Sequence, residues 1–252
     1  MSNRKWQLSE LTISWNCHCS SHICIRHFTS HFSTCDHYTN TSIWCEMTPL
    51  CLHARSVCFV KLALQRVDCP DAYSIDGFNV IMFPCNSAST TRPHYGLTVY
   101  SKQPVLHSCQ PVSLADSCGT VECALVQVAV KPFVILSVVC VYRRPSSDMS
   151  HFATAMLRLT SYLSTCQSAS SNVTHHTVIM GDFNLDWFDH QTPASMSSLL
   201  PEYRQLVTQV TTDYASALDH VYTSIPADQI QCYVGESYFS DHKPVTVSID
   251  LD

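Results

Sequence analysis

The chain has 252 residues, of which 46% are hydrophobic and 13% are charged, and glycine occurs only 5 times. This composition allows a large buried core and excludes an intrinsically disordered chain. The formal net charge of −6 argues against a general nucleic-acid coat protein, because such proteins are normally basic.

The sequence shows no pattern typical of membrane insertion or secretion. No apolar run reaches the roughly 18 residues that a membrane-spanning helix needs, and the longest, residues 132–142, is typical of a buried strand. The first residues lack the apolar segment of a signal peptide. The 15 cysteines are scattered, unlike the disulfide framework of a small secreted domain. We therefore expect reduced thiols, a nuclear or cytoplasmic protein that is not secreted, and no membrane partner.

The N-terminal part of the chain has the least regular pattern. Residues 11–16 alternate apolar and polar side chains, which predicts a half-buried strand, and residues 42–45 are a short second candidate strand. Residues 17–70 otherwise lack clean periodicity and are rich in cysteine and histidine. Zinc modules use paired ligands at regular spacing, whereas Cys17 and Cys19 are too close together and no second pair completes a finger. We therefore interpret this stretch as irregular rather than as a zinc site.

Four strands are predicted in the middle of the chain. Residues 77–83 and residues 94–101 each read as a strand. Residues 121–130 and 133–142 are apolar and rich in β-branched side chains, and only Lys131-Pro132 separates them. This pattern predicts a tight hairpin in the middle of a sheet.

A helix is predicted after this hairpin. Residues 146–148 offer side chains that can cap its N-terminus. Its buried face is marked by four apolar residues at the 4-3-4 spacing of a helix: Phe152, Met156, Leu159 and Leu163. A polar loop over residues 164–176 then leads to a strand over residues 177–180.

The remaining elements complete one domain. A second helix is predicted over residues 196–207, with Pro201 near its first turn or interrupting it. The alternation of Val245, Val247 and Ile249 predicts a final strand. We find no internal repeat and no linker, so we expect a single domain over residues 1–252. Strand pairs interspersed with helices predict an α/β fold in which two sheets pack face to face with helices outside.

Three short acidic motifs follow one another near the C-terminus, each at the end of an apolar run. They are Gly181-Asp182-Phe183-Asn184, Leu218-Asp219-His220 and Ser240-Asp241-His242. Hydrolysis of a phosphate ester needs a metal ion to neutralise developing charge, a group that activates water, and donors for the phosphate oxygens. Hard divalent cations prefer carboxylate ligands. The residue types of the three motifs therefore fit metal-dependent phosphate chemistry at a common rim of the sheets.

Together these motifs resemble the endonuclease/exonuclease/phosphatase superfamily, whose members cut phosphodiester or phosphomonoester bonds with a divalent metal. Each motif alone could be an ordinary turn, but their shared order and strand contexts make a specific signal. Trp15-Asn16 resembles the first-strand asparagine motif, Cys45-Glu46 resembles the metal-binding glutamate, and a Tyr-Arg-x-Pro segment begins at Tyr142. The resemblance implies a four-layer α/β sandwich with two mixed β-sheets face to face and helices outside.

The resemblance also implies the metal and its ligands. Mg²⁺ would be the cofactor, and Mn²⁺ could substitute for it. Glu46 would be the principal ligand, with Asp241 as a further ligand, direct or through water. Family members usually carry Glu-Thr at the first of these positions, whereas here Glu46 precedes Met47.

Six residues receive catalytic roles from the resemblance: Asn16, Tyr142, Asp182, Asn184, Asp219 and His242. Asp182 would orient or deprotonate the attacking water. The two asparagines and the tyrosine would hold the phosphate and its neighbours. The histidine would stabilise the charge of the scissile phosphate or take part in proton transfer.

The partner of His242 can be predicted from strand geometry. Adjacent residues in an extended segment point to opposite faces, so the carboxylate of Asp241 cannot easily reach the neighbouring ring. Asp219 lies on a separate strand and can reach it, which would fix the tautomer and raise the basicity of the ring.

Other side chains could contact a nucleic acid. Arg143 and Arg144 follow Tyr142 directly, so we expect them to contact the nucleic-acid backbone. Trp187 and Phe188 lie just past Asn184, at the end of the first acidic motif. They are aromatic and could stack on bases, although packing at the rim is the commoner role of such residues.

Within the superfamily, the motifs look most like endonuclease domains of mobile elements, namely non-LTR retrotransposons and Helitron-like transposons. In such elements the domain nicks DNA and is usually fused to, or associated with, a reverse transcriptase or helicase. The resemblance thus implies a DNA substrate, and we expect a monomer.

Two alternatives stay open. The superfamily also contains phosphatases and lipid phosphodiesterases, although the Pro-x-Trp-x-Asp-Arg element expected in an inositol phosphatase is absent. The chain could also be a catalytically inactive relic that serves as a binding module, which the irregular residues 17–70 favour and the intact acidic motifs oppose.

Overall fold

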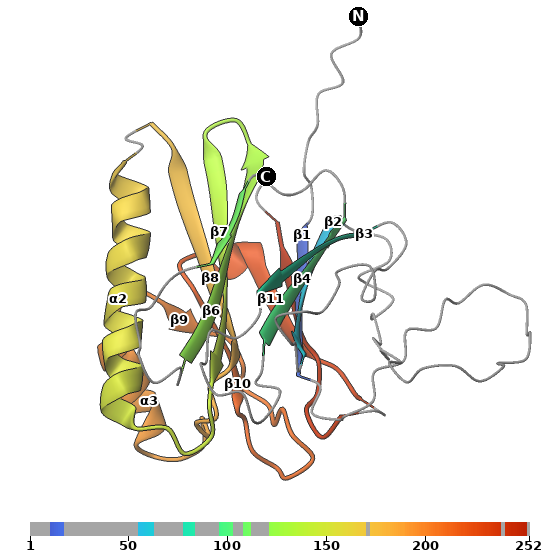
Figure 1. Ribbon diagram of the computed structural model, residues 1–252, viewed down its shortest axis with the longest axis vertical. Helices are drawn as coiled ribbons and strands as arrows, with labels where there is room; N and C mark the ends of the chain where they lie inside the picture. Colours follow the sequence, from blue (N-terminus) through green and yellow to red (C-terminus); the bar gives the residue numbers. More distant parts are fainter. Residues whose placement is uncertain are drawn as a thin grey trace, which may run out of the picture.

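The computed structural model describes residues 11–17, 55–62, 78–83, 96–102, 108–111, 121–169, 172–237 and 240–250. Three sequence predictions therefore concern residues that are not described: the ligand Glu46, the candidate strand over residues 42–45, and Cys19 of the Cys17–Cys19 spacing. Two sheets stand face to face, and the α-helices of the described part lie beside one of them (Figure 1). No helix in these ranges is long and apolar enough to cross a membrane.

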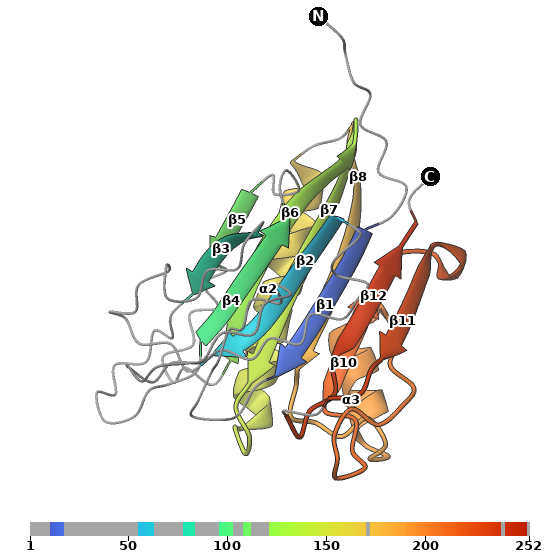
Figure 2. The same cartoon turned by 90° about the vertical axis from the view of Figure 1, so that its right-hand side faces the viewer.

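Sheet A contains strands from both ends of the described chain. Its strand order is β11-β12-β1-β2-β4-β3, and Figure 2 shows this sheet facing the viewer. Within it only β1 and β2 pair in parallel. Its strands are β1 (Leu11–Cys17), β2 (Arg55–Leu62), β3 (Phe78–Phe83), β4 (Gly96–Lys102), β11 (Ile230–Val234) and β12 (Val245–Ile249).

Sheet B has the order β5-β6-β7-β8-β10-β9, and within it only β7 and β8 pair in parallel. Its strands are β5 (Ser108–Pro111), β6 (Val121–Lys131), β7 (Val134–Arg143), β8 (Thr174–Asp182), β9 (Arg204–Gln205) and β10 (Asp219–Thr223). The predicted central hairpin is confirmed, since β6 and β7 are antiparallel neighbours joined by a turn at Pro132 and Phe133.

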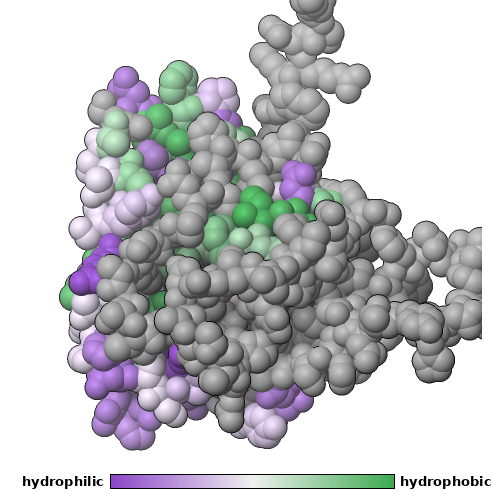
Figure 3. Space-filling view, viewed as in Figure 1, coloured by the Kyte–Doolittle hydropathy of each residue, from purple (hydrophilic) through white to green (hydrophobic). Residues whose placement is uncertain are grey.

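The first predicted helix is confirmed as α2 (Met149–Ser168). The carboxylate of Asp148 caps it by accepting a hydrogen bond of 2.6 Å from the backbone N–H of Ser150. The four residues predicted for its inner face are all buried. Its outward side, at the left of Figure 3, is mostly hydrophilic. Helix α2 therefore covers sheet B as an amphipathic surface helix.

The second helix differs from the prediction in its limits. Helix α3 (Thr192–Leu199) begins before the predicted start and ends before Pro201. Pro193 lies in its first turn, where the missing N–H costs nothing. Leu200 has a φ of −129° and a ψ of 57°, which is not helical, because a residue before proline is disfavoured in the α region. The residues beyond enter β9 instead.

The loop predicted over residues 164–176 is also shorter than expected. Helix α2 continues to Ser168, and β8 already begins at Thr174. The histidines His175 and His176 belong to β8 and pair with Ile135 and Leu136 of β7. These polar residues predicted a loop, but parallel pairing with β7 stabilises them as a strand.

Two hydrophobic cores hold the layers together. The first lies between the sheets and includes Ile13 and Leu97 from sheet A with Val126 and Val138 from sheet B. The second lies between sheet B and the helices. The protein is thus an α/β sandwich of two mixed sheets with helices outside, as predicted. Among the described elements α-helices cover only sheet B, so an outer layer on sheet A stays a prediction.

The register brings the motifs to one end of the sandwich. Asp182 ends β8 and Asp219 begins the antiparallel β10, and the two residues pair. Asp219 is therefore the first residue of its strand, and the prediction that it follows an apolar strand is wrong. In sheet A, Val245 at the start of β12 pairs with Trp15 near the end of β1, which places the His242 loop at the same end.

Gly181 explains why a glycine precedes the first acidic residue. Its φ is +143°, and a Cβ atom at this position would lie 1.9 Å from the carbonyl oxygen of Val141 on β7. The absence of a side chain lets β8 approach β7 closely directly before Asp182.

We expect Gly181→Ala to lower the free energy of unfolding by on the order of 3 kcal/mol, because it adds backbone strain and overpacking at once. Chemical denaturation followed by circular dichroism measures the change. Gly235→Ala is the matched control, since its Cβ would meet the ring of Pro244 at 3.1 Å and the carbonyl oxygen of Pro244 at 3.7 Å, without a positive φ. Equal stability of the two variants would contradict the role given to Gly181.

Candidate active site

Two buried carboxylates lie side by side at the end of sheet B. Asp182 is 1% exposed and Asp219 is 0% exposed. Residues two positions away in each strand, Met180 and Val221, belong to the core between the sheets. Because side chains alternate along a strand, both carboxylates point to this same face, toward sheet A. Their burial demands partners, since an unpaired charge in the interior is costly.

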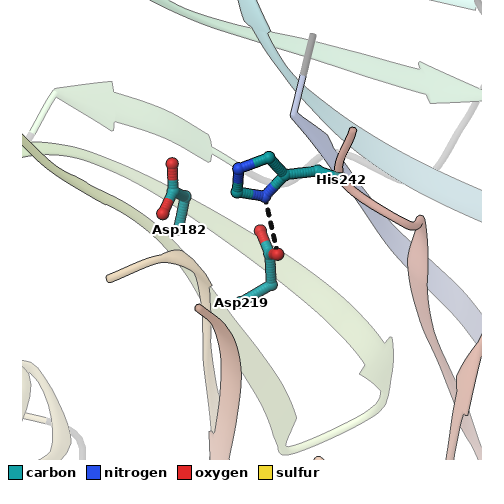
Figure 4. Close-up of side chains that lie close together, drawn as sticks. All are labelled: Asp182, Asp219 and His242. Carbon is teal, nitrogen blue, oxygen red and sulfur yellow. Dashed lines mark hydrogen bonds and ion pairs between the residues drawn. The ribbon is translucent and has the colours of Figure 1, made fainter. Parts of the chain in front are cut away.

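His242 supplies a partner from the other sheet. The loop that holds it precedes β12, and its Nδ1 lies 2.8 Å from Oδ2 of Asp219 (Figure 4). This confirms that Asp219 rather than Asp241 is its partner. The other ring nitrogen lies on the side of Asp182 (Figure 4).

The surroundings of His242 favour its protonated form. Burial alone would lower the pKa of the ring, but the hydrogen bond to Asp219 and the charges of Asp219, Asp182 and Asp241 raise the pKa to about 9. In the metal-free protein the ring is therefore an imidazolium at neutral pH, with an N–H donor on each nitrogen.

The same three residues can hold a metal ion. Asp182, Asp219 and His242 each offer one ligand atom, and these atoms lie within 4.8 Å of one another. Carboxylate oxygens and imidazole nitrogens are both ligands that divalent cations take in proteins. The predicted ligand Asp241 is not in this group, although its charge acts on His242. The predicted ligand Glu46 lies outside the described residues.

A short loop over residues 211–216 joins the two halves of the site. The hydroxyl of Thr211 accepts hydrogen bonds from the backbone N–H groups of Leu218 and Asp219, at 3.0 and 3.1 Å. Its carbonyl accepts from the N–H of Lys243 at 2.7 Å. The loop therefore ties the Asp219 strand to the His242 segment. Sequence reasoning missed Thr211, and no motif marks it.

Asn184 adopts a conformation that suits its residue type. Its φ is +49°, and its backbone N–H donates to Oδ1 of Asp182 at 3.0 Å. Its side-chain Nδ2 donates to the carbonyl of Arg143 at 2.7 Å. Asparagine tolerates the left-handed region better than other non-glycine residues. The structure thus brings Asn184 beside Asp182, as the motif implied.

Arg143 has a different place from the one predicted. It is 4% exposed, and its guanidinium donates to the carbonyls of Ser147 and Asn184, the latter at 3.0 Å. Both terminal nitrogens of the guanidinium are thereby bonded to the protein's own backbone, which offsets part of the cost of burying the charge. We correct the predicted nucleic-acid contact of Arg143 to a role in holding the Asn184 loop. The contact predicted for Arg144 stays a prediction.

Tyr142 belongs to a row of residues across sheet B. The registers pair Tyr142 with Asp182 on one side and with Glu122 on the other. Paired residues share a face, so Glu122, Tyr142, Asp182 and Asp219 all point toward sheet A. Tyr142 itself is fully buried. Glu122 was missed by sequence reasoning, although its place at the start of β6 opposite Tyr142 could have indicated it.

Of the other predicted residues, Asn16 is described only by its backbone. Asn16 lies in β1, where its backbone pairs with Val60 of β2. Trp187 is half-buried and packs against His220, whereas Phe188 is 50% exposed. Trp187 is therefore a packing residue, and base stacking by Phe188 stays a prediction.

An α/β sandwich with a buried Asp–Asp–His group at one end defines a class of metal-dependent hydrolases of phosphodiester bonds. The model of the Endonuclease/Exonuclease/phosphatase family matches residues 13–242, and the chain belongs to this family. No curated protein matches the sequence.

Solved structures share the fold at low sequence identity. The human Nocturnin catalytic domain with bound sulfate is 11% identical with a TM-score of 0.55, covering 76% of this chain and 79% of its own. An endonuclease/exonuclease/phosphatase family protein from Bacteroides thetaiotaomicron is 12% identical with a TM-score of 0.55, covering 78% and 81%. Truncated Caenorhabditis elegans TDP2 is 11% identical with a TM-score of 0.53, covering 77% and 84%.

We expect Asp219→Asn to lower the pKa of His242 from about 9 by at least about one unit, since the charged hydrogen bond is lost while burial persists. Titration of the His242 ring by NMR in EDTA measures the change. Asp228→Asn, at an exposed carboxylate in the 3-10 helix Ala227–Gln229, is the control. An unchanged pKa in Asp219→Asn would mean that other charges hold the proton.

Proposed function

We propose that this chain is a divalent-metal-dependent DNA endonuclease that nicks DNA and derives from a mobile element. The observation that carries the proposal is the buried Asp219–His242 pair facing Asp182 at the end of the sandwich. The Tyr-Arg-x-Pro segment at Tyr142 and the motifs around Asp219 and His242, which resemble mobile-element endonucleases, support the narrower assignment.

Residues of the chain would act on both reactants, with Asp182 acting on the attacking water and His242 acting on the phosphate. Asp182 accepts a proton from the attacking water or orients it, because its carboxylate lies beside the His242 ring without being that ring's hydrogen-bond partner. His242, held by Asp219, directs its second N–H at the phosphate and stabilises the charge that develops there. Asn184 would hold the phosphate next to Asp182.

A divalent cation would be held by Glu46, with Asp241 as a further ligand, as the resemblance implies, which leaves Asp182 to act on the water and His242 to donate to the phosphate. If Asp182, Asp219 and His242 held the cation instead, Nε2 of His242 would be a ligand and could not donate. When bound, the cation neutralises developing charge on the phosphate oxygens.

We propose a single domain that acts as a monomer in the nucleus or cytoplasm, with DNA as its substrate. In related elements it would be fused to or associated with a reverse transcriptase or helicase. The net charge of −6 gives little attraction for DNA, so the cation has a part in substrate binding as well as in catalysis.

Nicking of supercoiled plasmid by the purified protein tests the proposal. We expect nicking with Mg²⁺ or Mn²⁺, none with EDTA, and at least about a hundredfold slower nicking by Asp182→Ala and by His242→Ala, the usual loss on removal of an acid or base. Asp213→Ala, at an exposed carboxylate on the neighbouring loop, should nick normally.

The other outcomes separate the alternatives. Folded protein that does not nick but releases phosphate from a phosphomonoester, or cleaves a lipid phosphodiester, would establish the alternative hydrolase. Folded protein without any of these activities would establish the inactive binding module.

A further inference from the structure

His220 lies directly behind the site, on the opposite face of sheet B from Asp219. The two residues are neighbours on β10, so their side chains point to opposite sides. His220 is fully buried. Its ring stacks on Phe183 with 4.9 Å between the ring centroids and meets Trp187 edge to face at 5.7 Å. The proposed reaction chemistry makes no use of this histidine.

The ring of His220 has a defined tautomer. Its Nε2 lies 2.8 Å from the carbonyl oxygen of Leu185 and 3.0 Å from that of Ala217. A carbonyl oxygen only accepts, so Nε2 carries the proton and donates to both. Nδ1 then accepts from the hydroxyl of Tyr222 at 2.9 Å. Burial lowers the pKa of His220 to about 4, which agrees with a neutral ring.

The two carbonyls belong to the two segments that carry the site. Leu185 directly follows Asn184, and Ala217 lies two residues before Asp219. One N–H group therefore joins the loop after β8 to the segment before β10. Backbone hydrogen bonds join the same two segments, from Phe183 N–H to Leu218 O at 2.9 Å and from Trp187 N–H to Ala217 O at 3.0 Å. We call this contact between residues 183–187 and residues 217–218 the seam.

The hydrogen bonds of the seam hold the loop in which Asn184 has an unusual backbone conformation. Asn184 has a positive φ, and such a conformation persists only when the surroundings hold it. Arg143 holds the loop from one side through the carbonyl of Asn184. His220 holds it from the other side, through the carbonyl of the next residue.

We propose that His220 is a positioning residue, whose Nε2–H clamps the Asn184 loop to the Asp219 strand and so fixes Asn184 and Asp182 relative to the Asp219–His242 pair. The inference rests on the proposed function for its effect on catalysis. The clamp itself is a property of the fold and can be measured without any activity.

Three variants test the clamp. His220→Phe keeps an aromatic ring for stacking but removes both nitrogens. His220→Gln places an amide N–H near the position of Nε2 and should restore the clamp. Leu163→Ala, in the buried face of α2, lowers stability without touching the seam and is the control for a merely structural effect.

The readouts are kcat and KM for plasmid nicking, and the NMR hydrogen-exchange rates of the Phe183, Asn184 and Trp187 amides in metal-free protein. For His220→Phe we expect kcat at least tenfold lower, KM within threefold, and exchange at these amides at least tenfold faster than in the wild type. His220→Gln should stay within threefold of the wild type on each readout. Leu163→Ala should keep kcat per folded molecule and show no selective exchange at the seam.

The opposite results overturn the proposal. Wild-type kcat in His220→Phe, or a loss that only follows the folded fraction as in Leu163→Ala, would leave His220 as an ordinary core residue. If the wild type does not nick DNA, the proposed function fails, and exchange alone decides the clamp. Selective acceleration at the three amides then supports it, and unchanged exchange overturns it.

Discussion

The hydrogen bond between Asp219 and His242 is the interaction on which the site depends, because it joins the two sheets where their motifs meet. Asp219 begins β10 in sheet B, and His242 precedes β12 in sheet A. Both residues are almost fully buried, so removing either would leave an uncompensated polar or charged group inside the protein. The packing of the sheets, through residues such as Ile13 and Val138, brings the pair together.

The elements around this pair serve mainly to hold it and Asp182 in place. Gly181 lets β8 approach β7 directly before Asp182, and the antiparallel register of β8 with β10 puts Asp182 beside Asp219. Thr211 fixes the backbone of Asp219, and Arg143 fixes the loop of Asn184. Hydrogen bonds of this kind are worth about 1 kcal/mol each for stability. Their larger effect is geometric, since catalytic groups must be pre-organised before the substrate arrives.

The sequence predicted those features that depend on local pattern or on a shared motif. The buried face of α2 follows from the spacing of Phe152 and its partners, and the pairing of Asp219 with His242 follows from the alternation of side chains along a strand. Features that depend on tertiary pairing could not be predicted. The interior place of Arg143 is an example, because an arginine after a strand reads equally well as a surface cation until the loop that folds over it is known.

The burial of Arg143 also changes how a substrate would be held. It removes from the exposed surface one of the two cations expected to contact the DNA backbone, in a chain whose net charge is already −6. Attraction of phosphate therefore falls to the protonated His242, to a bound cation and to local groups such as Arg144. Such a site neutralises few phosphates, and the affinity of a protein for DNA depends on salt in proportion to that number. The proposed endonuclease would thus bind DNA weakly by itself, and an associated DNA-binding partner would supply the affinity that this domain lacks.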